Sequence, residues 1–136
     1  LDAGTAASAM RLLEQFGLAG VATARATELN EGTRKLTDIA MAMALRPRLL
    51  LMDEPTSGVA SAEKFGIMDT LVAALRAERV TAVFVEHDME VVERYADRVA
   101  VWSQGKILAF GPPAAVLSDP AVLREVIGVE TGHAHA

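Results

Sequence analysis

The chain has 136 residues, no cysteine and a formal net charge of −5 at pH 7, so it is one domain or a piece of one, without disulfides or thiolate zinc sites. Its acidic balance disfavours binding to nucleic acid or to an anionic membrane surface, and we expect no nucleic-acid partner. Hydrophobic residues make up 51% of the chain, enough for a core, but no apolar run approaches the roughly 18–20 residues of a membrane span.

The first third of the chain predicts two helices joined by a connector. Apolar residues recur at helical spacing over residues 5–18, and the pattern stops near Gly17. Residues 19–30 form the connector, and residues 31–45 are rich in helix formers. Pro47 ends the second helix, because the residue before a proline avoids the helical conformation. One face of that helix carries four apolar residues: Leu36, Ile39, Ala40 and Met43.

The middle of the chain reads as strand, helix, strand. The runs "LLLMD" (49–53) and "TAVFVEHD" (81–88) are continuously apolar before they reach charged residues, which suits parallel strands covered on both faces. Residues 61–79 between them read as an amphipathic helix. Its expected apolar face consists of Phe65, Met68, Leu71, Val72 and Leu75.

The last part of the chain predicts smaller elements. Residues 89–96 form a short helix, and residues 97–111 form two strands joined by a turn at Gln104 and Gly105. Trp102, in the first of these strands, is expected in the core of the sheet.

Two short helices and a tail complete the chain. Prolines open both helices within residues 112–128, and Asp119 is a candidate cap of the second. We expect the tail from Glu130 on to be loose. His133 and His135 stand two apart in it, and we expect no metal site there because two histidines do not complete a ligand shell.

The alternation of strands and helices predicts an α/β fold with a parallel sheet. In such sheets ligands bind beyond the carboxyl ends of the strands. Five polar residues follow the two apolar strands at such ends: Asp53, Glu54, Glu86, His87 and Asp88. Their convergence predicts a site at this edge of the sheet.

The stretch "LLLMDEP" suggests chemistry as well as structure. A buried strand that runs into a polar turn is one explanation. The other is that Asp53 holds Mg²⁺ through a water, because hard cations prefer oxygen ligands, while Glu54 orients or deprotonates a water that attacks a phosphate. His87 is either a loop histidine or a group that binds a phosphate oxygen and the same water.

The stretch "LNEGT" (29–33) opens the second predicted helix. Backbone N–H groups at a helix start, near Gly32, attract an anion such as a phosphate. When the stretch is taken alone, an ordinary helix entry is the better explanation.

In this order, the motifs resemble those of the nucleotide-binding subunits of ABC transporters. "LNEGT" is similar to a divergent LSGGQ signature, "LLLMDEP" resembles Walker B with its catalytic glutamate, "SGVA" sits where the D-loop lies, and His87 matches the switch histidine. The resemblance covers the chain up to about residue 130. The end of the chain, from "VEHDM" on, is similar to the ATPases of branched-chain amino-acid importers.

The resemblance implies the C-terminal part of a P-loop NTPase (RecA-like) core, together with part of the helical signature subdomain. The implied segments are residues 1–46 for the helical part, 47–111 for the core with its motifs, 112–130 for the C-terminal helices and 131–136 for a flexible tail.

The resemblance also implies ATP and Mg²⁺ as cofactors and assigns the site residues. Glu54 and His87 would be catalytic and Asp53 would bind Mg²⁺ through a water; the implied nucleotide-binding residues are Asn30, Gly32, Thr33, Ser57 and Gly58.

The partners implied by the resemblance are a second ATPase subunit in a head-to-tail dimer, transmembrane permease subunits and, indirectly, a solute-binding protein. The chain would then lie in the cytoplasm at the inner face of the membrane and would serve the import of branched-chain amino acids or related solutes.

Three departures from the family pattern matter. The sequence has no G-x-x-x-x-G-K-[ST], so we expect a fragment that does not hydrolyse ATP alone. Glu31 adds negative charge at the signature, and Ala60 replaces a usually polar D-loop residue. A non-enzymatic half-domain and another ABC system, such as lipopolysaccharide export, remain as alternatives.

Overall fold

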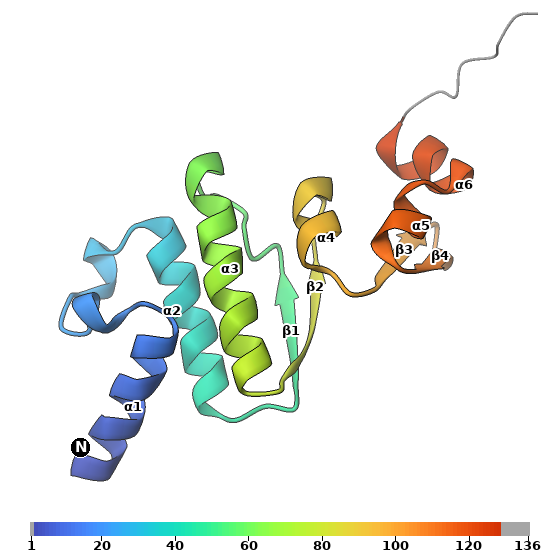
Figure 1. Cartoon of the computed structure of the whole chain (residues 1–136). Coiled ribbons are helices and arrows are strands. Elements are labelled where there is room, and N and C mark those ends of the chain that lie inside the picture. Colours follow the sequence, from blue (N-terminus) through green and yellow to red (C-terminus); the bar gives the residue numbers. More distant parts are fainter. Residues whose placement is uncertain (1, 129–136) are drawn as a thin grey trace, which may run out of the picture. The chain divides into compact units, whose positions relative to one another are not determined.

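The structure is a computed structural model that describes residues 2–128, apart from the side chain of Ile127. It divides into two compact units, Leu1–His87 and Asp88–Ala136, whose helices and strands are labelled in Figure 1. This division does not test the predicted segments 1–46, 47–111 and 112–130, which stay predictions. The predicted flexible tail and its two histidines lie outside the described residues.

The first unit begins with two helices, α1 (Ala3–Gln15) and α2 (Glu31–Ala44), which contact each other. Two single turns of 3-10 helix, Ala19–Val21 and Ala26–Glu28, lie in the connector between them. The carboxylate of Asp2 caps α1 by accepting the backbone N–H and the hydroxyl of Thr5, and these hydrogen bonds hold the pKa of that carboxyl below its ordinary value.

Two parallel strands follow, β1 (Leu49–Asp53) and β2 (Thr81–Val85), with helix α3 (Ser61–Ala77) between them (Figure 1). Leu49 pairs with Thr81 at the start of the register and Asp53 pairs with Val85 at its end. A helix that joins neighbouring parallel strands crosses one face of their sheet, so α3 covers only one side.

The two faces of the sheet differ sharply in exposure. Leu50 is 9% exposed on one face, whereas Leu51 and Val85 on the other are 70% and 63% exposed. Leu49 and Val83 extend this open face, and both are also exposed. Only one face of the two strands is therefore covered in this chain, although their continuous apolar runs suit a sheet that is covered on both faces. The reason is that no element of the described residues crosses the second face.

The buried faces of α2 and α3 agree with the predicted apolar faces at most positions. On α2, Leu36, Ala40 and Met43 are buried as expected and Ile39 is half-buried. On α3 the buried residues are Ile67, Met68, Leu71, Ala74 and Leu75. Phe65 and Val72 were predicted there, but both are half-buried. Their positions at the margin of the helical stripe explain the difference, because Ile67 and Ala74 lie closer to its centre.

The second unit holds helix α4 (Met89–Tyr95), the antiparallel strands β3 (Val99–Ser103) and β4 (Lys106–Gly111), and helices α5 (Pro113–Leu117) and α6 (Pro120–Val122). A π-helical turn, Leu123–Ile127, ends the described part. Gln104 and Gly105, both with positive φ, form the predicted hairpin turn. Asp119 caps α6 as predicted, by accepting the Ala121 N–H. The small core contains Val101, Val116 and Val122, with Val99, Leu108 and Ala109 against it.

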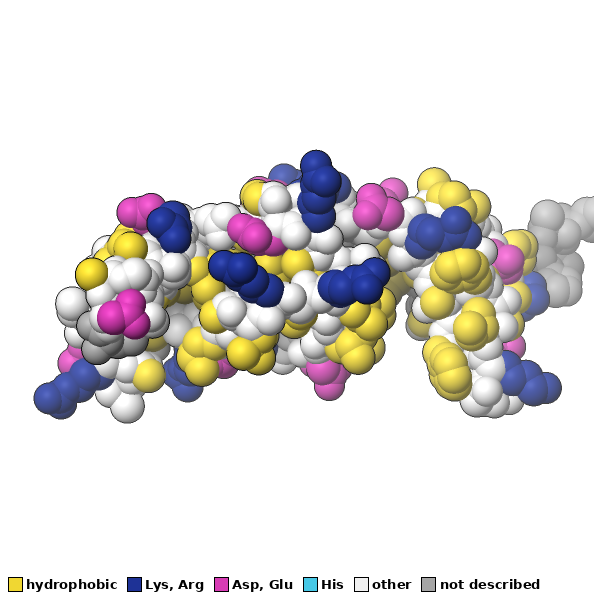
Figure 2. Space-filling view, turned by 90° about the horizontal axis from the view of Figure 1, so that it is seen from below, with side chains coloured by type: hydrophobic (Ala, Val, Ile, Leu, Met, Phe, Trp, Pro, Cys, Tyr) yellow, Lys and Arg dark blue, Asp and Glu magenta, His cyan; other side chains and the backbone are white. Residues whose placement is uncertain are grey.

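Trp102 is not in the core, contrary to prediction, and is 70% exposed. Val101 points into the core, so the next residue faces the opposite side of the hairpin. Its partner across the hairpin, Ile107, is exposed as well, and the Arg98 guanidinium lies 4.4 Å from the exposed Phe110 ring. Figure 2 shows one face of the molecule, on which hydrophobic side chains lie open to solvent among Lys and Arg side chains.

The difference between the two sheet faces can be measured as stability. We expect Leu71→Ala, at a fully buried position, to lower the free energy of unfolding by about 2–5 kcal/mol. Leu51→Ala on the open face should cost less than about 1 kcal/mol, because little apolar surface returns to water. Chemical denaturation of both variants checks this, and equal losses would contradict the open face.

Candidate functional site

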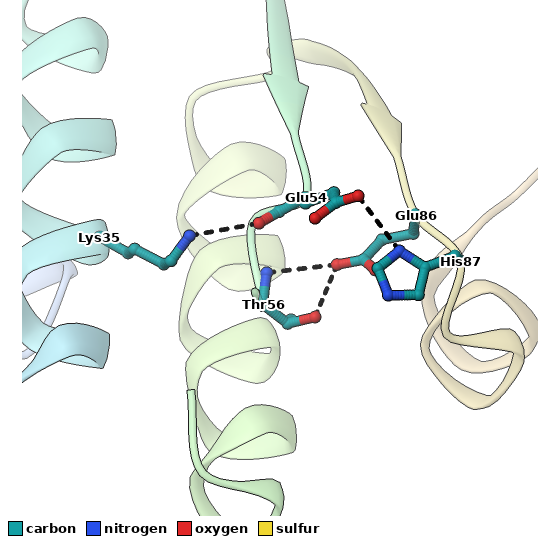
Figure 3. A network of polar contacts seen from close by, with 5 residues as sticks. All are labelled: Lys35, Glu54, Thr56, Glu86 and His87. Atoms are coloured by element: carbon teal, nitrogen blue, oxygen red, sulfur yellow. Dashed lines mark hydrogen bonds and ion pairs between the residues drawn. The ribbon is translucent and has the colours of Figure 1, made fainter. Parts of the chain in front are cut away.

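The site lies where β1 and β2 end together. Because Asp53 pairs with Val85, the residues that follow both strands leave the sheet at the same edge. The Glu54 N–H donates to the Val85 carbonyl at 2.9 Å and extends the strand pairing by one bond. Figure 3 shows that this edge brings together side chains from α2, from the end of β1 and from the end of β2.

Glu54 and His87 meet at this edge. Their Oε1 and Nδ1 atoms are 3.2 Å apart, and their side chains are 42% and 77% exposed (Figure 3). A pair this exposed contributes little to stability, typically about 0–1 kcal/mol. Its importance is geometric. Since Nδ1 faces the carboxylate, Nε2 is the ring nitrogen that remains for a ligand, and both side chains are accessible to one.

The backbone of Glu54 is held in an uncommon conformation. Its φ is +46°, in the left-handed region that non-glycine residues rarely adopt and that costs of the order of 1–3 kcal/mol. The Glu54 carbonyl accepts the Ser57 N–H at 3.0 Å and the Lys35 ammonium at 3.3 Å. Such strain persists only where surrounding contacts impose it, and here they fix the direction of the Glu54 side chain.

Thr56 and Glu86 tie the loop after β1 to the end of β2. The Thr56 hydroxyl donates to Glu86 Oε1 at 2.6 Å, and the Thr56 N–H donates to the same oxygen at 3.2 Å (Figure 3). Thr56 is 7% exposed and is the buried polar residue of the described chain. Thr56 lies two residues after Glu54, and Glu86 directly precedes His87. The contact between Thr56 and Glu86 therefore helps to keep Glu54 close to His87.

The start of α2 forms the second predicted part of the site. Asn30 caps the helix, and its Oδ1 accepts the Thr33 N–H at 2.8 Å. The Thr33 N–H is therefore already bonded, so the prediction of open N–H groups at this helix start does not hold for Thr33. The Asn30 amide nitrogen is not used by the cap and can donate to an anion. Gly32 is buried, and a methyl group in its place would overlap Ile67.

Glu31, which adds negative charge at the start of α2, lies beside the predicted D-loop segment at Ser57 and Gly58. Its carboxylate is 3.5 Å from Arg34, and a Cβ on Gly58 would come within 3.4 Å of its Cγ. Gly58 has a φ of +75°, which a side chain would strain. Arg34 thus partly neutralises Glu31, and the stretch that includes Ser57 and Gly58 lies against the helix start.

Asp53, the predicted magnesium residue, ends β1 on its open face and is exposed. The described residues contain no group of three or more His, Asp or Glu side chains that would hold a metal by themselves. One exposed carboxylate fits Mg²⁺, which keeps several waters and is usually shared between one or two carboxylates and phosphates. Asp53 therefore fits a nucleotide-bound magnesium ion and does not fit a metal site built from protein alone.

Two other residues from the sequence analysis stand at the N-cap positions of helices. Asp88 accepts the N–H groups of Glu90 and Val91 and so caps α4. Ala60 stands at the N-cap of α3 without a side-chain hydrogen bond. Its alanine therefore leaves that helix start uncapped by a side chain.

A cavity of about 380 Å³ lies at the opposite end of β1 and β2. It is lined by Met43, Arg46, Pro47, Arg48, Glu78, Arg79 and Val80. Arg46 and Arg79 follow the ends of α2 and α3, where cations complement the partial negative charge of a helix terminus. The cavity is therefore separate from the carboxyl-end site, and two of its arginines, Arg46 and Arg79, have a structural explanation.

The sequence pattern missed Lys35 and Thr56 in this network, and it placed Glu86 at the strand end without predicting its bond to Thr56. Lys35 is half-buried, because it stands three residues after the buried Gly32 and so lies on the same side of the helix. That three-residue spacing was a usable signal. No spacing rule connects Thr56 with Glu86, which are thirty residues apart.

Comparison with known proteins gives consistent matches. A family model described as "ABC transporter" matches residues 4–57. The cobalt import ATP-binding protein CbiO of Rhodobacter capsulatus is 45% identical over 97 residues, which are 71% of this chain and 34% of that protein. The high-affinity branched-chain amino acid transport ATP-binding protein BraF of Pseudomonas aeruginosa is 36% identical over 117 residues, which are 85% of this chain and 46% of that protein.

A solved structure agrees with these matches. The crystal structure of a nucleotide-free ATP-binding cassette from an ABC transporter superposes with a TM-score of 0.82 at 32% identity, and the match covers 95% of this chain and 52% of that one. The chain thus spans about half of the solved cassette and less than half of the two curated relatives.

The contact between Thr56 and Glu86 can be tested by substitution. Thr56→Val removes a buried hydroxyl bonded to a carboxylate, and we expect the free energy of unfolding to fall by about 1–3 kcal/mol. Thr70→Val is the matched control, because the Thr70 hydroxyl bonds the Gly66 carbonyl on an exposed helix face and its loss should cost less than about 0.5 kcal/mol. Strict additivity of Thr56→Val with Glu86→Ala would contradict the pairing.

Proposed function

The chain belongs to the family of ABC transporter ATP-binding proteins, and we propose that it is the C-terminal half of one such subunit, which hydrolyses ATP only together with its other half. The matched family and the solved cassette confirm the predicted resemblance and the predicted α/β P-loop NTPase fold. The activity, substrates and partners of the whole protein are the subject of the proposal.

One observation carries the proposal of ATP hydrolysis, the 3.2 Å contact between Glu54 and His87 at the ends of neighbouring parallel strands. A carboxylate in this position accepts a proton from a water that attacks the terminal phosphate. The histidine, which is oriented by that carboxylate, donates to a phosphate oxygen and holds the water in line. Glu54 is the proposed general base and His87 the proposed orienting residue.

The remaining site residues have distinct proposed roles. Asp53 would hold Mg²⁺ through a water, and the ion would supply charge neutralisation of the phosphates when bound. Asn30, Gly32 and Thr33 would face the nucleotide of a second subunit, with the Asn30 amide as a donor to phosphate. Ser57 and Gly58, which lie against the same helix start, would belong to that shared surface.

The open face of the β1–β2 sheet supports the proposal of a half-subunit. Leu49, Leu51, Val83 and Val85 are each more than half exposed on this one face. Exposed, contiguous apolar surface of this kind normally binds another protein surface. A segment carrying a phosphate-binding loop would cover the face and complete the nucleotide site beside Asp53.

We propose that the complete subunit drives solute import. The relatives that match this chain include proteins named for cobalt import and for branched-chain amino acid transport. The last part of the chain, which begins with "EHDM" at Glu86, resembles the ATPases of branched-chain amino-acid importers. This resemblance favours branched-chain amino acids or related small solutes as the transported substrate. The proposed partners are a second ATPase subunit, permease subunits and, through them, a solute-binding protein.

The proposed location is peripheral, at the inner face of the membrane through the permease subunits. No helix in the described part of the chain is long and apolar enough to cross a bilayer.

A non-enzymatic interaction module is the second candidate function. The open apolar face of β1 and β2 favours it, because that face is suited to binding another protein whether or not Glu54 acts on a nucleotide. The two functions differ in one respect: only the ATPase requires the Glu54 carboxylate. An ATPase of another ABC system, such as one for lipopolysaccharide export, differs only in what its partner subunits transport.

Glu54→Gln in the complete subunit separates these functions. We expect ATP binding to be retained and hydrolysis to fall by at least about a hundredfold, because glutamine keeps the shape but does not accept a proton. Nucleotide binding and phosphate release are measured on the same preparation, with Glu63→Gln, an exposed residue of the first turn of α3, as the control. Unchanged hydrolysis in Glu54→Gln would refute the assignment of the base.

The proposal also predicts a change in the cost of Leu51→Ala. In the chain alone the substitution is inexpensive, but in a complete subunit it should cost about 2–5 kcal/mol, because Leu51 would then be buried. Denaturation of the complete subunit with and without the substitution measures this. An equally small cost there would mean that the missing half does not cover the face.

A further inference from the structure

The ammonium group of Lys35 connects the start of α2 to the backbone of Glu54. Its Nζ lies 3.3 Å from the Glu54 carbonyl oxygen, across nineteen residues of sequence (Figure 3). Lys35 is half-buried and, within residues 2–128, makes no ion pair with a carboxylate. A partly desolvated cation therefore bonds to a neutral carbonyl and not to a carboxylate of the described residues.

The carbonyl that it binds belongs to the strained residue of the site. Glu54 has a φ of +46°, and its carbonyl also accepts the Ser57 N–H at 3.0 Å. The plane of the peptide that follows Glu54 is therefore fixed from two sides, by the turn to Ser57 and by Lys35. A change in the φ of Glu54 would swing its carbonyl and its side chain together about the N–Cα bond, so loss of the contacts on the carbonyl would let the side chain turn away from His87.

The neighbouring cation shows that the contact is specific to one position. Arg34 is exposed and pairs with Glu31 one helical turn earlier, whereas Lys35 is half-buried and lies one helical turn after the buried Gly32. The two adjacent cations of α2 therefore have different roles. Arg34 balances the negative charge of Glu31 at the helix start, and Lys35 contacts the loop after β1.

We propose that Lys35 is a positioning residue, which holds the Glu54 peptide in its left-handed conformation and couples it mechanically to the Asn30 end of α2. This inference depends on the proposed function only for its catalytic consequence. A displacement of the start of α2 would pass through the Lys35 bond to Glu54 and change the direction of its carboxylate. Lys35 itself touches neither nucleotide nor water in this role.

The test uses the complete subunit with Lys35→Met, Lys35→Arg and the matched control Arg34→Met. Amide hydrogen exchange of Ser57, whose N–H shares the Glu54 carbonyl, reports the conformation directly. We expect Lys35→Met to raise that exchange rate about tenfold, since a charge-assisted hydrogen bond is lost. ATP hydrolysis should show kcat lowered about tenfold with KM for ATP within about twofold, because Lys35 positions the base and does not bind substrate.

The two other variants separate positioning from general loss of charge or stability. Lys35→Arg keeps a cation of similar reach and should retain most of the protection of Ser57 and most of kcat. Arg34→Met should change the Ser57 exchange rate by less than about twofold. If Lys35→Met does not fold, Lys35→Gln, which keeps an N–H donor without the charge, is measured by the same two readouts.

The outcomes distinguish this inference from the proposed function. If Ser57 exchange and kcat are unchanged in Lys35→Met, Lys35 does not position Glu54 and the inference is wrong. If the unmodified subunit hydrolyses no ATP, the proposed function fails, while Ser57 exchange still decides whether Lys35 holds the loop. A fall in kcat without any change in Ser57 exchange would also overturn the inference, because the effect would then arise elsewhere.

Discussion

The parallel pairing of β1 with β2 is the constraint on which the rest of the site depends. Its register sets Asp53 opposite Val85, so the chain leaves both strands at one level and places Glu54 beside Glu86 and His87. A shift by one residue would turn the side chains of one strand to the other face and separate these groups. The continuation of the ladder by the Glu54 N–H, bonded to the Val85 carbonyl, holds this register at the edge where the chemistry would occur.

The loop after β1 shows how a costly conformation is maintained. Glu54 occupies the left-handed region without being glycine, and several contacts act on the loop at once: the turn to Ser57, the Lys35 ammonium, and the anchoring of Thr56 by Glu86. Strain that is held by contacts from different elements is typical of functional sites. The same contacts place a carboxylate and an imidazole 3.2 Å apart without burying either of them, so both remain accessible to a ligand.

The open face of the sheet relates the stability of the chain to its proposed place in a larger subunit. Residues such as Leu51 and Val83 are exposed although their strands are apolar on both sides. Strands of this composition are stable when helices cover both faces, and in the first unit α3 crosses only one. Asp53 lies on this open face, so the proposed magnesium ligand and the surface proposed to bind the rest of a larger subunit belong to the same side of β1.

The sequence by itself determined the strands, the main helices, the strand-end position of Asp53, Glu54 and His87, and the family resemblance. These follow from local patterns, since apolar runs, helical spacing and motif order are all written along the chain. Only the tertiary structure decided which face of each strand is covered, that Trp102 lies outside the core, and that Lys35 and Glu86 support the site. These depend on which elements cross one another in space, and neither a period of two or 3.6 residues nor a motif contains that information.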